Sequence, residues 1–314
     1  MSAAMSTTFD PTTIPSLHSK VLFITGGTAG LGRETIFSLA AHSPAHIYFS
    51  GRSQSSATAL IADLAKTHPG VPCTFVRADL ASLTSVKTAA EEFLAQETRL
   101  DLMFANAGVM ALPPGLTEDG YEVQFGTNHM GHAALVKLLL PVMEATAQRG
   151  HDVRIIWNTS LGYRGASGID FATLKTPQAC LSPVYVLSDW FRYGQSKLAN
   201  LLYAREFATR YPTIMSVAIH PGVSDTGLVT GLGTFNRWFV WATTLRIKVP
   251  IEQCAWNQQW AAVAKKGEGE REVVSGVFYE PVGVKGGLTK AGGDDLLARE
   301  LWEWTQKELE AFGI

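Results

Sequence analysis

Short apolar runs alternate with longer segments of helical periodicity along most of the chain. The runs are rich in β-branched and aromatic residues and carry almost no charge, which is typical of strands buried on both faces. The predicted strands span residues 21–25, 46–50, 74–77, 100–105, 153–159, 216–220 and 276–280. The predicted helices lie near 30–42, 56–67, 82–97, 119–146, 190–210, 251–265 and 293–311.

This alternation is the pattern of repeated βαβ units. It predicts the α/β class, as a single Rossmann-type doubly wound parallel sheet of about seven strands flanked by helices. Residues 20–314 would form this one domain after a flexible leader at 1–19. Stretches near 160–189 and 222–250 fit no compact core and follow strand ends, where open α/β sheets bind ligands. We interpret them as insertions that wall a substrate site.

Composition favours a small molecule as the partner. The 26 Lys and Arg residues nearly balance 28 Asp and Glu residues without a basic stripe, so nucleic acid is not expected. The most apolar run, 133–143, contains Lys137 and Pro141 and is too short for a transmembrane segment. Three widely spaced cysteines form no disulfide framework and no zinc motif, which favours a reducing, cytoplasmic location.

A glycine-rich loop joins the first predicted strand to the first predicted helix. Its glycines allow a sharp turn and close approach to a pyrophosphate, whose charge the N-terminus of the helix stabilises. The alternatives are an ordinary tight turn and a P-loop, but Arg33 and Glu34 stand where a P-loop needs Lys and Ser or Thr. The loop residues expected to bind a dinucleotide are Gly26, Thr28, Gly30, Leu31 and Gly32.

The end of the second strand indicates which dinucleotide is preferred. An acidic residue there would bind the adenosine ribose hydroxyls of NAD, whereas Ser50 followed by Arg52 favours a 2′-phosphate and therefore NADP(H). Arg33 is a candidate for a second cation, or equally for a solvated surface residue. Asp79 and Leu80 follow the third strand and are placed to contact the adenine, while Asn106 follows the fourth strand beside the cofactor.

Tyr193 and Lys197 are the candidates for proton-transfer chemistry. They lie four residues apart on a predicted helix and share one face. A nearby ammonium and a positively charged nicotinamide ring would lower the pKa of the phenol from its usual value of about 10 towards the working range. The pair Tyr48 and Arg52 has the same spacing but lies on a strand, where the two groups are too far apart to cooperate.

Taken in order, the motifs resemble those of the short-chain dehydrogenases/reductases over about residues 20–225. Residues 193–201 and the stretch His220-Pro221-Gly222-Val223 most resemble the branch with retinol dehydrogenases and fungal biosynthetic reductases. The motifs are residues 25–32, Asn106-Ala107-Gly108, Asn128, Ser160, Tyr193-Gly194-Gln195-Ser196-Lys197 and Pro221-Gly222.

The resemblance implies a role for each matching residue. Tyr193 would exchange a proton with the substrate oxygen while hydride moves to or from the nicotinamide, and Ser160 would hydrogen-bond the same oxygen. Lys197 would also bind the nicotinamide ribose, and Asn128 would hold a water that relays protons. The implied cofactor-binding residues are Gly26, Thr28, Gly30, Leu31, Gly32, Arg52, Asp79, Leu80, Asn106, Tyr193, Lys197, Pro221 and Val223.

The sequence also departs from the family pattern. Ala105 replaces a first asparagine before Asn106, which would remove a structural hydrogen bond, and Ser160 stands 33 positions before Tyr193, more than is usual. Thr159 and Ser167 are alternatives to Ser160. The aromatic segment 235–241 would line a pocket, form a lid or pack in the core, and we expect no membrane anchor of the kind found in many retinol dehydrogenases.

Three functions are considered for the chain. The first is reduction or oxidation of a carbonyl or alcohol of a lipophilic small molecule of secondary metabolism, by a possible homodimer or homotetramer. The second is an NADP(H)-binding redox sensor or scaffold without turnover. The third, a hydrolase, lacks a nucleophile elbow around Ser160, and His129 and His132 belong to no metal motif.

Overall fold

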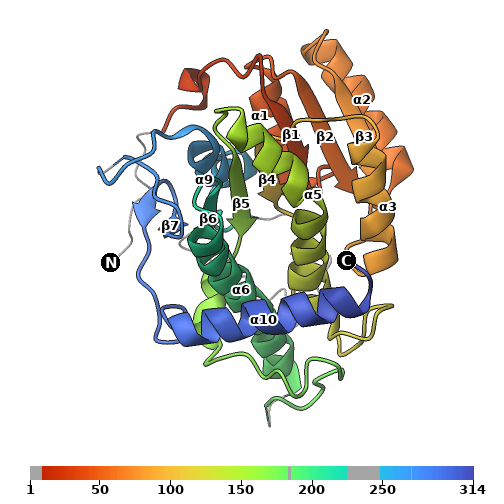
Figure 1. The fold of residues 1–314 in the computed structure, drawn as a ribbon, viewed down its shortest axis with the longest axis vertical. Helices are drawn as coiled ribbons and strands as arrows, with labels where there is room; N and C mark the ends of the chain where they lie inside the picture. The colour runs from red at the N-terminus through yellow and green to blue at the C-terminus, as the bar shows by residue number, and fades with distance from the viewer. Residues whose placement is uncertain (1–8, 183–184, 225–247, 270) are drawn as a thin grey trace.

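The computed structural model describes residues 9–182, 185–224, 248–269 and 271–314. One eight-stranded sheet has the order β3-β2-β1-β4-β5-β6-β7-β8, in which all neighbouring pairs are parallel except β7 and β8 (Figure 1). The strands are β1 (Val21–Ile24), β2 (His46–Gly51), β3 (Cys73–Arg77), β4 (Leu102–Ala105), β5 (Arg154–Asn158), β6 (Met215–Ile219), β7 (Phe278–Glu280) and β8 (Val284–Lys285). The predicted doubly wound α/β fold is confirmed.

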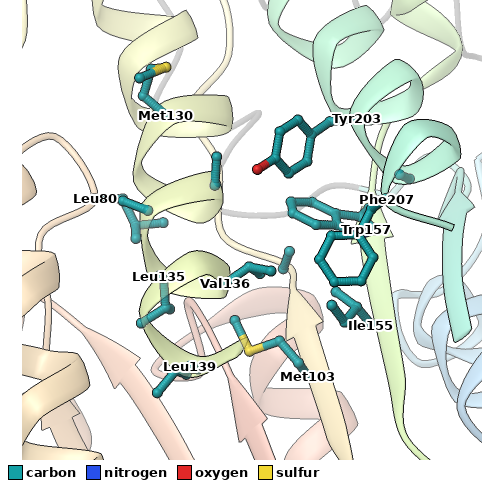
Figure 2. Close-up of a cluster of buried hydrophobic side chains, with 14 of the residues drawn as sticks. Leu80, Met103, Met130, Leu135, Val136, Leu139, Ile155, Trp157, Tyr203 and Phe207 are labelled. Carbon is teal, nitrogen blue, oxygen red and sulfur yellow. The ribbon is translucent and has the colours of Figure 1, made fainter. Parts of the chain in front are cut away.

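The central strands are mostly apolar because both faces of the sheet are covered. In β1, Phe23 belongs to one buried cluster, whereas Leu22 and Ile24 belong to another on the opposite face. Figure 2 shows the first cluster, in which Met103 and Trp157 of the sheet lie between side chains of two helices. Continuous burial of this kind removes the polar alternation of a one-sided sheet, as the sequence predicted.

Helices α3, α5 and α6 cover one face, α1, α2 and α9 cover the other, and α10 lies across α6 (Figure 1). The α-helices are α1 (Gly30–Ala40), α2 (Gln54–Thr67), α3 (Leu83–Leu94), α4 (Val123–Phe125), α5 (Gly131–Gln148), α6 (Tyr185–Arg210), α9 (Ile251–Val263) and α10 (Asp295–Ala311). Short 3-10 turns lie at η1 (Pro11–Thr13) and η3 (Leu161–Gly165).

The helix predicted near 119–146 differs from the observed structure. The chain is helical only from Val123, and the π-turn η2 (Gly126–Met130) separates α4 from α5. The Glu122 carboxylate accepts hydrogen bonds from the amides of Gln124 and Phe125, and so begins the helix four residues late. A π-turn depends on its tertiary contacts and leaves no mark in apolar periodicity.

Of the two insertions, the structure describes most of 160–189, which opens with η3 on the end of β5. The predicted aromatic segment 235–241 lies outside the described residues. Within the described residues no helix is long and apolar enough to cross a membrane.

Candidate active site

The glycine loop between β1 and α1 has the geometry that a bound pyrophosphate requires. Gly26 and Gly30 adopt positive φ of 67° and 58°. A Cβ on Gly32 would collide with the carbonyl oxygen of Gly26, so α1 begins directly against the loop. Ala29 caps α1 without any side-chain hydrogen bond, which leaves the first amides of this helix to an anion. These residues therefore fit a dinucleotide.

Asn106 joins three strands at the edge of the sheet that the loop occupies. Its Nδ2 donates to the Thr25 carbonyl at 2.8 Å, and its Oδ1 accepts from Asn158 Nδ2 at 2.9 Å. The Thr25 hydroxyl oxygen accepts the amides of Asn106 and Ala107 at 2.9 and 3.0 Å. The Asn106 side chain thus links neighbouring strands. It supplies a structural hydrogen bond of the kind that we expected to be lost because position 105 is alanine.

Tyr193 and Ser160 meet at the carboxyl end of β5. The Tyr193 side chain is 5% exposed and packs against Met110 and Trp190. Ser160 hydrogen-bonds the Tyr193 hydroxyl, and its Oγ also accepts the Gly162 amide at 3.1 Å. The structure brings these two predicted residues together across the long spacing between them.

Lys197 lies one helical turn beyond Tyr193, in the same buried region. Its Nζ donates to the Asn158 carbonyl at 3.0 Å and lies 5.9 Å from the centroid of the Tyr193 ring. Burial lowers the pKa of Lys197 to about 8. Lys197 Nζ and Asn128 Oδ1 both approach to within 3.3 Å of the position that a Cβ on Gly108 would occupy, so a larger residue there would press on both groups.

In the protein without cofactor, burial dominates the pKa of Tyr193, and the lowering expected from Lys197 with a charged nicotinamide ring stays a prediction. Burial raises the pKa of Tyr193 to about 12, and the hydrogen bond from Ser160 opposes this rise only in part. The reason is desolvation, which disfavours a phenolate with so little exposed surface. Lys197 Nζ meanwhile donates to the Asn158 carbonyl rather than to the phenol.

Asn128 lies in the middle of the π-turn and is completely buried. Its Oδ1 accepts the Val109 amide at 2.7 Å, and its Nδ2 donates to the Val109 carbonyl and to Ser196 Oγ, each at 2.9 Å. Both amide protons are therefore used within the protein. Any water at this residue would have to donate its own proton to an Asn128 oxygen.

Beyond the carboxyl ends of β2 and β3, Arg52 and Asp79 line a surface pocket of about 460 Å³ together with Arg77, which the sequence reasoning did not single out. Arg77 ends β3 beside Gly51, and this adjacency depends on strand register. Leu80 lies against Gly131 of α5, where a Cβ would collide with the Leu80 carbonyl oxygen. Arg33 instead pairs with Asp63 at 3.0 Å and lies over the Phe37 ring, which fits the surface role considered for it.

The remaining predicted positions are also placed. Pro221 and Val223 follow β6, and Gly222 between them adopts a φ of 100°. Thr159, the alternative to Ser160, donates its hydroxyl to the Lys197 carbonyl at 2.7 Å, so it is engaged with α6. Ser167 is exposed. No group of three or more metal-ligating side chains occurs in the part of the chain that the structure describes.

The fully buried Arg192 connects the insertion near 160–189 to this site. Arg192 lies 2.6 Å from Asp189 and 3.2 Å from Glu122. It also donates to the carbonyls of Gln178 and Leu112, which belong to the insertion and to the loop after β4. The residue next to Tyr193 thereby holds both of these loops.

A doubly wound parallel sheet with this glycine turn after its first strand defines a dinucleotide-binding α/β protein. The family model described as short chain dehydrogenase matches residues 20–165. A short-chain dehydrogenase/reductase of Armillaria gallica is 35% identical over 95% of this chain and 93% of its own length. Retinol dehydrogenase 14 of Mus musculus is 33% identical over 91% of this chain and 85% of its own length. The chain therefore belongs to the short-chain dehydrogenase/reductase family, a family of oxidoreductases, and the predicted resemblance is confirmed.

Solved structures agree with this assignment. An uncharacterised protein from Mycobacterium paratuberculosis aligns with a TM-score of 0.72 and 25% identity, over 96% of this chain and 97% of that one. A blue fluorescent protein from a metagenomic library, solved in complex with NADPH, aligns with a TM-score of 0.61 and 26% identity, over 85% of this chain and 98% of that one.

Proposed function

We propose that the chain is an NADP(H)-dependent reductase of ketones or aldehydes, in which Tyr193 delivers the proton. The observation that carries this proposal is the buried contact of Tyr193 with Ser160, with Lys197 one helical turn away, at the end of the sheet that holds the glycine loop. Open α/β sheets bind ligands at this edge.

The proposed cofactor is NADP(H). Gly26, Gly30 and the uncapped start of α1 would hold the pyrophosphate, and Arg52 with Arg77 would hold the 2′-phosphate. Lys197 would bind the nicotinamide ribose. The structure solved with NADPH has the same fold, which is consistent with this assignment.

When bound, the cofactor supplies the hydride that a carbonyl carbon accepts. The chain's own task is to hold the carbonyl oxygen and protonate it. The Ser160 hydroxyl would hydrogen-bond this oxygen, and Tyr193, whose raised pKa keeps it protonated at neutral pH, would donate its proton to it. A protonated phenol suits reduction, because reduction consumes a proton at that oxygen.

The proposed substrate is a lipophilic small molecule. Met110, Trp190 and Tyr193 form a small apolar cluster beside the reactive hydroxyl. The similarity to retinol dehydrogenase 14 of the mouse, whose name gives a lipophilic substrate, supports a substrate of this kind. Secondary metabolism, the cytoplasmic location and a homodimer or homotetramer remain predictions.

Purified protein tests the proposal in a panel of ketones and aldehydes, with NADPH oxidation as the readout. We expect turnover by the unaltered chain and a loss of at least about 100-fold in kcat for Tyr193→Phe, because the phenyl ring cannot donate a proton. NADPH binding, followed by its fluorescence, should survive the substitution. Binding by both proteins without turnover of any carbonyl would favour the redox sensor or scaffold instead.

A further inference from the structure

The buried histidine His132 connects two parts of the candidate site. His132, on α5, is completely buried, and its two ring nitrogens have different partners. Nδ1 lies 2.8 Å from the main-chain oxygen of Asn128, and Nε2 lies 2.8 Å from the hydroxyl of Thr25. Thr25 immediately precedes the glycine loop, so the imidazole bridges this loop and the π-turn.

The partners determine which nitrogen carries the proton. A carbonyl oxygen can only accept, so Nδ1 must donate to Asn128. Burial lowers the pKa of His132 to about 4, so the ring is neutral at pH 7 and Nε2 must accept. The Thr25 oxygen already accepts the amides of Asn106 and Ala107, which leaves its single proton for Nε2 rather than for the more distant Phe104 carbonyl at 3.1 Å.

The bridge continues to the proposed proton donor. Asn128 Nδ2 donates to Ser196 Oγ at 2.9 Å, and the Ser196 hydroxyl donates to the Tyr193 carbonyl at 2.8 Å. Four consecutive buried hydrogen bonds therefore run from Thr25 through His132, Asn128 and Ser196 to Tyr193.

We propose that His132 is a positioning residue that sets the distance between the glycine loop and the turn of α6 that carries Tyr193. This inference rests on the proposed function, in which the loop holds the cofactor and Tyr193 protonates the substrate. The hydrogen bonds are directional and buried, so loss of the imidazole releases the Thr25 hydroxyl and the Asn128 carbonyl at once. A shift of the Tyr193 turn relative to bound cofactor slows the chemical step more than it weakens binding.

His129 provides a matched control on the same side of the fold. It is also completely buried, and burial lowers its pKa to about 3, but its Nε2 bonds the Thr305 hydroxyl of α10 at 3.0 Å. Its ring packs between Phe125 and Tyr203, in the core rather than at the site. A general loss of stability would therefore affect His129 and His132 variants alike, whereas mispositioning would affect only the second.

We expect His132→Phe to lower kcat at least tenfold while the KM for the carbonyl substrate changes less than threefold. His132→Gln, which keeps a donor and an acceptor, should retain more of kcat than His132→Phe. His129→Phe should keep kcat within threefold of the unaltered protein at a temperature where all the variants are folded. Equal values of kcat for His132→Phe and His129→Phe would overturn the inference.

A second measurement needs neither a variant nor turnover. In protein labelled with ¹⁵N-histidine, the imidazole of His132 should have a protonated Nδ1 and an unprotonated Nε2, without titration between pH 6 and 9. A proton on Nε2 would break the proposed chain and overturn the inference. Absence of turnover by the unaltered protein would instead contradict the proposed function, so the two failures are distinguishable.

Discussion

The sequence and the structure indicate opposite effects on the pKa of Tyr193. Its spacing from Lys197 indicates a tuned phenol, whereas the burial seen in the structure raises its pKa to about 12. Lys197 loses its proton more easily than an exposed lysine, because burial lowers its pKa to about 8. The cofactor-free site thus holds a neutral phenol at neutral pH, and the positive charge of an oxidised nicotinamide would be needed before the phenolate became accessible.

The choice of cofactor is testable at Arg52. Arg52→Asp places a carboxylate where we propose the 2′-phosphate, so we expect the Kd for NADPH to rise at least tenfold and the Kd for NADH to change much less. Arg33→Asp is the control, because Arg33 is engaged with Asp63 and Phe37 and should leave the ratio of the two constants unchanged. Equal weakening of both cofactors by Arg52→Asp would remove the assignment.

At this scale, sequence reasoning can identify candidate residues that share a local pattern. Tyr193 and Lys197 share a helical face and Ser160 follows an apolar strand, and the resemblance to the family singled out all three. His132 and Asn158 could not be identified in this way, because each looks like an isolated polar residue in an apolar segment. Their importance comes from partners that are distant in sequence, such as Thr25 for His132 and Lys197 for Asn158.

At the scale of elements, we expect stability to depend strongly on Arg192, the buried arginine of α6. Arg192→Leu would remove the cation that lies 3.2 Å from the fully buried Glu122 carboxyl, and we expect a loss of about 3 kcal/mol in the free energy of unfolding. Chemical denaturation measures this loss.

The double variant Arg192→Leu with Glu122→Gln separates the charge from the packing. The glutamine oxygen can still accept the amides of Gln124 and Phe125, so we expect it to recover part of the lost stability. Additive effects of the two substitutions would show that the ion pair is not the cause.

Strands were predicted more closely than helices, for a physical reason. Burial on both faces makes β1 entirely and β6 largely apolar, and their predicted ends agree with the structure to within one residue. The π-turn at 126–130 was missed because apolar periodicity continues through it. Strand β8 has only two residues, both exposed, so no pattern of burial predicts it.

At the scale of the whole molecule, buried histidines make stability depend on pH. Burial lowers the pKa of His129 to about 3 and of His132 and His220 to about 4, below the value of about 6.5 in an unfolded chain. Between these pKa values the unfolded chain binds more protons than the folded protein. The contribution of these histidines to the free energy of unfolding is therefore fully present above pH 6.5 and decreases as the pH is lowered. Glu122 opposes this, since burial raises its pKa to about 7.

Three histidines against one glutamate give a net loss on the order of 3 kcal/mol between pH 7.5 and 5. The free energy of unfolding measured by denaturant at both pH values checks this expectation. His129→Phe should reduce the difference between the two pH values, because it removes one of the titrating groups. A stability that stays constant or rises towards pH 5 would contradict it.

The central claim is that Tyr193 and Ser160 together hold the oxygen of a carbonyl substrate beside the cofactor. A crystal structure with NADPH and a ketone inhibitor measures this most directly, through the distance from Tyr193 Oη to the ketone oxygen. We expect about 2.6 to 3.2 Å, with Ser160 Oγ bonded to the same oxygen. A hydroxyl turned away from the nicotinamide, or a ketone bound elsewhere, would contradict the account.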